Sequence, residues 1–418
     1  MTSRLAVGIV GMAGLLAQEP PPGLLARIKG RVDENLQRLP DYTCVQTIER
    51  ASRDRPGADY KAVDTLRLEV GLVGQKERFG WLDASQFEDK PLADMVGFGA
   101  TGTGSFALHA GSVFRPRVAD FTYQGEVTHA GRPAYRWDYE VPVERSRYRL
   151  RVGGREAVVG FHGSFWVDRE TLDLVRLEVQ VDEIPSELGL MNSSDKVDYA
   201  RTALGDAEFI LPQSAELIMI DRYQHETRNR TRFGRCRQFT VESRVKFDAE
   251  TKPETATGAN APASLDLPPR LTLELALDTE ITPQTAAIGD PVRAVLERPL
   301  KHGERVLAPK GATVLGRITR VEKEAMPFPH YVVALQFHTL QLGASSIGFS
   351  ATMEDAGPAP GLLRQAKRMD PVFTKRRSPR LDILVREQQR GQGVLHWEAR
   401  RPHIPKGLRM RWETGPVP

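Results

Sequence analysis

Residues 165–177 read FWVDRETLDLVRL, and this stretch decides the fold. Phe165–Asp168 and Leu172–Leu177 contain the aromatic, β-branched and alternating apolar residues that are typical of strands. Arg169–Thr171 between them is polar and marks a tight turn. The stretch therefore predicts a β-hairpin.

The same strand signal continues on both sides of this hairpin. Turns are indicated at residues 130–133 and 204–206. Consecutive hairpins predict an antiparallel sheet that curls into a half-barrel. The predicted strands are Tyr42–Arg50, Val63–Val73, Gln75–Trp81, Phe121–His129, Ala134–Pro142, Ser164–Asp168, Leu172–Ile184, Val197–Ala203, Ala207–Leu211, Ala215–Tyr223 and Arg235–Phe247.

Two segments break this strand pattern. Residues 24–39 place leucine, isoleucine and valine on one face at helical spacing, and Pro40 ends the predicted helix. Residues 90–113 predict one or two short helices. Within them, residues 97–104 are rich in glycine but lack the lysine of a phosphate-binding loop, so a lid or hinge is the preferred interpretation. We expect the helix and this insertion to pack on the concave face of the sheet.

A second domain is predicted after a linker. Residues 249–267 are rich in Thr, Ala and Pro, a linker composition. Residues 268–418 hold 23 Lys and Arg against 15 Asp and Glu, a net charge of +8; the whole chain is +4, so the rest carries −4. This asymmetry favours two units. The second is also predicted to be β, with a tight turn at Pro309–Gly311 and a strand bend at Gly316.

The beginning of the chain resembles an export signal. Residues 1–4 are short and basic, and residues 5–17 are apolar and uncharged, which fits a signal peptide and is too short for a transmembrane helix. Gln18 follows where a lipoprotein would carry its cysteine. We therefore expect a periplasmic or secreted protein that is not a lipoprotein, with an uncleaved short anchor as the alternative.

The chain has two cysteines, Cys44 and Cys236, each in a predicted strand. An even cysteine count after an export signal predicts a disulfide, here between the start and the end of the first domain. Two unrelated buried thiols are the alternative.

Residues 22–248 resemble the LolA/LolB-like fold, whose repeated hairpin has the pattern seen at 165–177. The resemblance implies a half-barrel that carries lipoproteins or acts as a periplasmic sensor. Residues 288–318, with Pro309, Gly311 and Gly316, resemble the small β-barrel of TrbI-like scaffold subunits. That resemblance implies a compact β domain and does not extend to a secretion role.

Signatures of catalysis are absent from the sequence. The nine histidines form no HExxH or HxH pair, and the two cysteines lack zinc spacing. The sequence contains neither a G-x-S-x-G elbow nor a P-loop. We therefore expect a protein that is not an enzyme and has no cofactor or metal, and an exported chain is not expected to bind nucleic acid.

Two features are candidates for binding. The first is a cavity for acyl chains on the concave face; a packed core is the alternative. Its predicted lining is Phe79, Trp81, Met95, Phe98, Phe106, Leu108, Trp137, Tyr139, Trp166, Ile218 and Ile220. The second is a basic stretch that could bind anionic lipid or glycan; an exposed loop is the preferred alternative. It consists of Arg364, Lys367, Arg368, Lys375, Arg376, Arg377 and Arg380.

These observations favour an exported, non-enzymatic binding protein that holds a lipid or lipidated ligand in the half-barrel. The second domain would contact an envelope protein or an anionic membrane surface. The alternative is a periplasmic sensor or scaffold that binds a protein partner. An unrecognised hydrolase is a third hypothesis, which no arrangement of residues supports.

Overall fold

The computed structural model describes most of the chain between residues 19 and 416. Several predicted features lie outside the described residues: the signal segment 1–17, the glycine-rich segment with Phe98 and Phe106, most of the linker, and the whole basic stretch from Arg364 to Arg380. The described residues are 19–74, 76–82, 84, 87, 88, 90, 92–96, 108–152, 154–239, 267–325, 328–343, 345–363 and 390–416.

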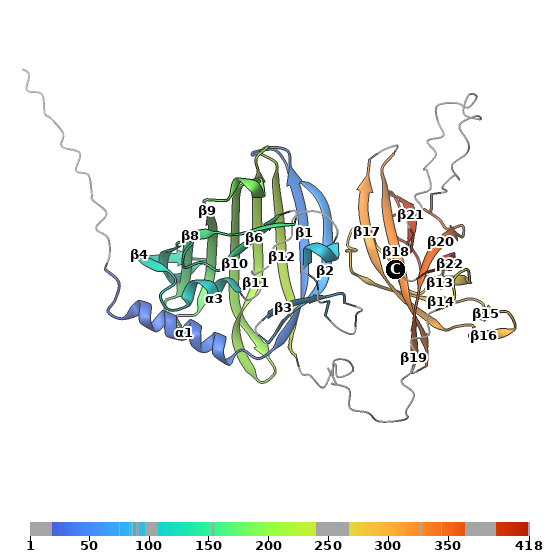
Figure 1. Ribbon diagram of the computed structural model, residues 1–418, viewed down its shortest axis with the longest axis horizontal. Coiled ribbons are helices and arrows are strands. Elements are labelled where there is room, and N and C mark those ends of the chain that lie inside the picture. Colours follow the sequence, from blue (N-terminus) through green and yellow to red (C-terminus); the bar gives the residue numbers. More distant parts are fainter. Residues whose placement is uncertain are drawn as a thin grey trace, which may run out of the picture.

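The first part of the chain forms a ten-stranded sheet in the order β3-β2-β1-β12-β11-β10-β9-β8-β5-β4, and every adjacent pair is antiparallel. The sheet curls as predicted (Figure 1). Its strands are β1 (Tyr42–Arg53), β2 (Lys61–Val73), β3 (Lys76–Gly80), β4 (Asp120–His129), β5 (Arg132–Val141), β8 (Gly160–Asp168), β9 (Leu174–Asp182), β10 (Leu190–Leu204), β11 (Ala207–Asp221) and β12 (Glu226–Gln238). A separate hairpin, β6 (Arg149–Val152) and β7 (Arg155–Val158), and the short helix η1 (Ser186–Leu188) complete this part.

The hairpin predicted from residues 165–177 is β8–β9. Its turn is closed by Asp168, whose Oδ1 accepts hydrogen bonds from the backbone nitrogens of Glu170 at 2.9 Å and Thr171 at 3.0 Å. Leu172 then adopts a positive φ of 57°. A short acidic side chain that bonds the backbone two and three residues ahead is a common way to close such a turn.

Three helices accompany the sheet. Helix α1 (Leu24–Arg38) buries Leu24, Ile28 and Val32, one residue per turn, as the spacing predicted. The insertion contains α2 (Leu92–Val96) and α3 (Leu108–Phe114), which confirms two short helices there. Figure 1 shows α1, in blue, along the lower side of the sheet with α3 above it.

Strands β11 and β12 differ from the prediction. Residues 207–221 form one strand rather than two, and β12 begins at Glu226 instead of Arg235. In β12 the alternation is hidden because the buried positions include Asn229 and Thr231 besides Phe233, while arginines occupy the opposite face. Because polar side chains occupy the inner face, the sequence shows no alternation of apolar and polar residues from which this strand could be predicted.

Cys44 and Cys236 are bonded to each other, which confirms the predicted disulfide. Cys44 lies on β1 and Cys236 on β12, and these two strands are neighbours in the sheet. The bond therefore joins the first strand of the domain to its last.

The second part of the chain forms an eight-stranded sheet in the order β19-β18-β17-β14-β13-β22-β20, with β21 paired to β18. The register of β17 against β18 shifts between Leu315 and Gly316, so the pairing is irregular where the strand bend was predicted. Trp397 and Trp412 are fully buried in its core. The strands are β13 (Thr272–Leu277), β14 (Pro291–Leu296), β17 (Thr313–Glu324), β18 (His330–Leu342), β19 (Ser345–Gly348), β20 (Ser350–Ala356), β21 (Gly393–Glu398) and β22 (Arg409–Gly415), with a separate hairpin of β15 (Leu300–His302) and β16 (Arg305–Ala308).

A short segment of the second domain joins the first sheet. Ile288 forms a parallel bridge with Leu66 on β2, through the bonds Arg67 N to Ile288 O at 2.7 Å and Ile288 N to Thr65 O at 2.8 Å. The Ile288 side chain packs in the core of the first domain. Gly289 must be glycine, because a Cβ there would lie 2.2 Å from the Arg67 carbonyl oxygen and its φ is 96°.

Within the described residues, no helix has the length and apolar character needed to cross a membrane.

Candidate functional site

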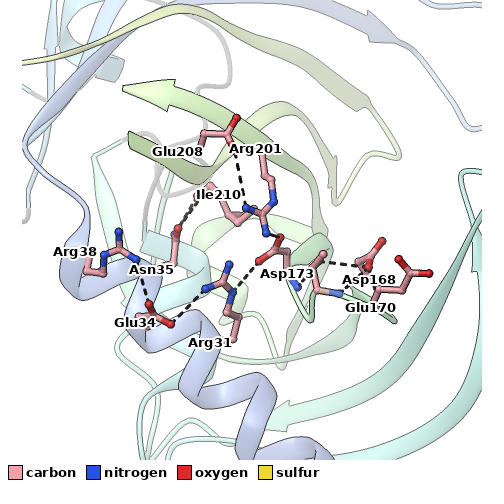
Figure 2. Close-up of polar contacts among 11 residues, drawn as sticks. Arg31, Glu34, Asn35, Arg38, Asp168, Glu170, Asp173, Arg201, Glu208 and Ile210 are labelled. Carbon is pink, nitrogen blue, oxygen red and sulfur yellow. Dashed lines mark hydrogen bonds and ion pairs between the residues drawn. The ribbon is translucent and has the colours of Figure 1, made fainter. Parts of the chain in front are cut away.

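Helix α1 is attached to the sheet by polar side chains beside its buried face. Asn35 pairs with the backbone of Ile210 on β11: its Nδ2 donates to the carbonyl oxygen at 3.1 Å and its Oδ1 accepts from the amide nitrogen at 2.9 Å. The Nε of Arg31 donates to Asp173 at 3.0 Å. Figure 2 shows both contacts, one from the helix to Asp173 between β8 and β9 and one to Ile210 on β11. These bonds fix the position of α1 on the sheet.

Asp173 is the centre of this network. It is buried and follows the turn that Asp168 closes, so the hairpin of residues 165–177 presents it to the helix. It accepts hydrogen bonds from both Arg31 and Arg201. The hydrogen bond to Asp173 raises the pKa of Arg31. The network continues along the helix surface through Glu34, which pairs with Arg31 and Arg38 (Figure 2).

A small cavity lies beneath α1. Its volume is about 30 Å³, and its lining includes Val32, Tyr42, Tyr199 and Leu211. A cavity that accommodates one water molecule measures roughly 10–15 Å³ on this scale. The space under the helix therefore suits a very small molecule and is far too small for an acyl chain.

A larger groove runs between α1 and α3. It has a volume of about 690 Å³, within the range of roughly 300–1,000 Å³ that is common for small-molecule sites. Apolar side chains from three elements line it: Leu36 and Leu39 at the end of the α1 segment, Leu72 at the end of β2, and Phe114 at the end of α3. The groove thus offers apolar side chains from three elements to a ligand.

The charged residues of this groove are mostly cationic. Of the described residues that line it, Lys29, Arg115 and Arg117 are cationic and Asp33 is acidic. In the described part of the chain, no carboxylate forms an ion pair with any of the three cations. Lys29 Nζ lies 4.1 Å from the centroid of the Phe121 ring, and burial lowers its pKa. Unpaired cations beside apolar surface favour a ligand that is both anionic and apolar.

Helix α3 is held from inside the half-barrel by a buried polar pair. His109 Nε2 and Asp195 Oδ2 on β10 are 2.9 Å apart, and both side chains are buried. Tyr148 packs its ring edge-on against His109, with the centroids 5.4 Å apart. Burial raises the pKa of Tyr148 well above its ordinary value. Since Phe114, Arg115 and Arg117 belong to α3 or follow it directly, this pair also positions one wall of the groove.

Among the residues predicted to line an acyl-chain cavity, those that the structure describes do not form one site. Phe79 is buried in one core cluster with Met95 and Trp81 packed against it, whereas Trp137 and Tyr139 are buried in another. Tyr139 donates a hydrogen bond to the Glu178 carbonyl oxygen at 2.7 Å. Nothing is described of the Leu108 side chain, and Phe98 and Phe106 lie outside the described residues.

Three of those residues lie on the opposite face of the sheet. Trp166 stands between the buried Phe165 and Val167, so it points away from the core, with Arg136 against its ring. Leu217 directly precedes Ile218 on β11 and pairs with Asp195 and Asn229 on the neighbouring strands. Both partners are buried, so Leu217 is on the inner face of the sheet, and Ile218 and Ile220 are at the alternate positions. These two isoleucines therefore also face outward, because successive side chains on a strand alternate between its faces.

The sequence analysis missed the residues that do form the groove. Leu36 and Leu39 were recognised only as part of an apolar helix face, and residues 114–117 were not singled out. The run Phe114–Arg115–Pro116–Arg117, an aromatic residue followed by cations at the end of a predicted helix, was the available signal.

Among the described residues, no group of three or more His, Cys, Asp and Glu side chains is placed to hold a metal ion.

No protein-family model matches this chain, and neither does any curated protein. Its solved structural neighbours include a DUF1329 family protein from Desulfovibrio piger (TM-score 0.29, 11% identity, covering 53% of this chain and 94% of that one). A Vibrio parahaemolyticus domain named for outer membrane lipoprotein sorting gives a TM-score of 0.27 at 11% identity, covering 51% and 90%. A LolA superfamily protein from Nitrosomonas europaea gives 0.26 at 9% identity, covering 53% and 97%.

Proposed function

We propose that this chain is an exported, non-enzymatic carrier that holds an anionic amphiphile in the groove between α1 and α3. The ligand would be a lipid or a lipidated molecule with an acidic head group. The observation that carries the proposal is the combination of Leu36, Leu39, Leu72 and Phe114 with three cations that lack ion-pair partners among the described residues.

The energetics of the groove support a ligand of this kind. Each buried CH₂ group contributes about 0.8 kcal/mol, so covering six to eight carbons of an acyl chain would contribute roughly 5–6 kcal/mol. An acidic head group beside Lys29, Arg115 and Arg117 adds charge-assisted hydrogen bonds. Export is proposed from the sequence of residues 1–17 and agrees with the disulfide between Cys44 and Cys236.

The second domain would serve as a contact module, for an envelope protein or an anionic membrane surface. The bridge from Ile288 to Leu66 favours a related function, that of a sensor which binds a protein partner. Because Ile288 packs in the core of the proposed ligand-binding domain, occupancy of that domain could act on the second one. Co-purification of a protein instead of an amphiphile would favour this second function.

The experiment is binding of a fluorescent fatty acid to the full chain and to the variant Leu36→Glu. A carboxylate in the apolar part of the groove should weaken binding at least about tenfold, a cost of about 1.4 kcal/mol or more. Ala26→Glu is the matched control, since it adds the same charge to an exposed position of the same helix. Equal affinities for wild type and Leu36→Glu, with both proteins folded, would contradict the proposal.

A further inference from the structure

Backbone and side-chain contacts join the two domains. Strand β3 covers the edge of β2 only from Glu69 to Val73, and Ile288 of the second domain pairs with the edge further along, at Leu66. Next to this bridge, Arg67 Nη1 donates to both carboxylate oxygens of Asp290, at 2.6 and 2.7 Å. Backbone pairing, a buried side chain and an ion pair therefore hold the two domains together at this junction.

A cleft of about 730 Å³ opens above this junction. One wall is formed by β1, β2 and β12 of the first domain, with Tyr60, Arg228 and Arg230. The other is formed by the end of β17 in the second domain, with Glu322, Lys323 and nearby residues. Since the junction fixes both walls, groups on either side keep their spacing before any ligand arrives. Such preorganisation lowers the entropic cost of binding.

Most of the charges in this cleft are already neutralised by neighbours. Glu49 pairs with Arg232, and Arg230 pairs with Glu216 at 2.9 Å. Glu322 lies 2.6 Å from Arg320. The other acids are occupied in the same way: Glu324 lies 3.9 Å from Arg320 and Asp64 pairs with Arg50 at 2.5 Å.

Two cations of the cleft have no ion-pair partner among the described residues. Arg228 lies over the ring of Tyr60, with its guanidinium carbon 3.6 Å from the ring centroid, and its buried Nε has no hydrogen-bond partner. The nearby Glu226 is already bonded by Arg53 at 2.6 Å and by the Tyr60 hydroxyl. Lys323, on the opposite wall, has its Nζ 6.0 Å from the Tyr331 ring. No described carboxylate forms an ion pair with either cation.

We propose that this cleft binds an oxyanion, a phosphate or a carboxylate group, between Arg228 and Lys323. A guanidinium held against an aromatic ring presents a planar fork of donors that matches oxyanion geometry, and an ammonium adds a second charge. No described residue that lines this cleft also lines the amphiphile groove. The site does not depend on the amphiphile proposal.

The test is calorimetric titration of the full chain with sodium pyrophosphate. Arg228→Gln and Lys323→Gln, one variant in each wall, should each weaken binding at least about tenfold, since a hydrogen bond to a charged group contributes about 1.5–3 kcal/mol. Lys301→Gln, an exposed lysine on β15 outside the cleft, removes the same charge and should leave the affinity unchanged.

A parallel arm uses phosphatidylglycerol vesicles, because the same phosphate chemistry occurs in lipid head groups. Binding of pyrophosphate identifies a soluble oxyanion; binding of the vesicles alone, lost in both variants, identifies a head group. If Arg228→Gln fails to fold because Tyr60 loses its partner, Lys323→Gln decides alone. The proposal is overturned if wild type binds neither probe, or if Lys323→Gln binds as wild type does.

Discussion

Removing the disulfide between Cys44 and Cys236 should destabilise the first domain substantially. The perturbation is the double substitution Cys44→Ser and Cys236→Ser, which leaves β1 and β12 paired through their backbones. Cys44 is buried and Cys236 packs against the same apolar cluster, so serine also places two hydroxyls near apolar side chains. Both effects act in the same direction.

The size of the effect follows from the length of the loop that the bond closes. The two cysteines are 192 residues apart in sequence. In the chain-entropy model a loop of that length gives about 5 kcal/mol of stabilisation, and measured losses on removing native disulfides are typically about 2–5 kcal/mol. For a domain of this size each kcal/mol moves the melting temperature by roughly 2–4 °C, so a loss of about 2–5 kcal/mol corresponds to a drop of roughly 4–20 °C.

The assay is thermal unfolding followed by circular dichroism, on oxidised wild type, reduced wild type and the double variant. Reduced wild type should melt close to the double variant, and both should melt well below oxidised wild type. A thiol assay on the denatured, unreduced wild type should find no free thiol. Coincident melting of oxidised and reduced wild type would refute the reasoning, as would two reactive thiols.

Two further stability predictions concern contacts that join distant parts of the chain. Ile288→Ala should cost about 2–5 kcal/mol in urea unfolding, because it empties a buried position that packs against Leu66; an unchanged midpoint would show that the junction does not form. Asp173→Asn should lower the free energy of unfolding by about 1–3 kcal/mol, since the arginines that Asp173 bonds are partly exposed and solvent screens the loss. The control is Asp206→Asn in an exposed turn, which should leave the free energy of unfolding unchanged. Equal unfolding of these two variants would contradict the role given to Asp173.

Features encoded locally could be predicted from the sequence. The turn of residues 165–177 and the apolar face of α1 each depend on residues close together in the chain. The disulfide was also predictable, because the chain has only two cysteines. An even cysteine count after an export signal predicts a disulfide without any knowledge of the distance between the two residues.

Features that depend on the curl of the sheet could not be predicted. Trp166 and Ile218 carry the same apolar signal as inward residues, and only the register against neighbouring strands shows that they face outward. In β12 the reverse holds, since buried Asn229 looks like a surface residue in the sequence. Strand propensity indicates that a residue suits a half-buried sheet, and it does not indicate whether its side chain lies on the buried face or on the exposed face.

The candidate sites were the least predictable part. The groove depends on where α1 and α3 lie relative to Leu72, and the bridge from Ile288 joins positions more than two hundred residues apart, 66 and 288. A parallel bridge between single residues of two domains leaves no pattern in the local sequence from which it could be predicted. The basic stretch from Arg364 to Arg380 stays a prediction, because it lies outside the described residues.

The measurement that tests the central claim most directly is native mass spectrometry of the protein purified from a bacterial periplasm, followed by extraction of whatever it carries. The account predicts a bound anionic amphiphile on wild type and on Ala26→Glu, and its loss from Leu36→Glu. A wild type that carries no amphiphile and binds no added fatty acid would contradict the account. So would a Leu36→Glu variant that retains as much ligand as wild type.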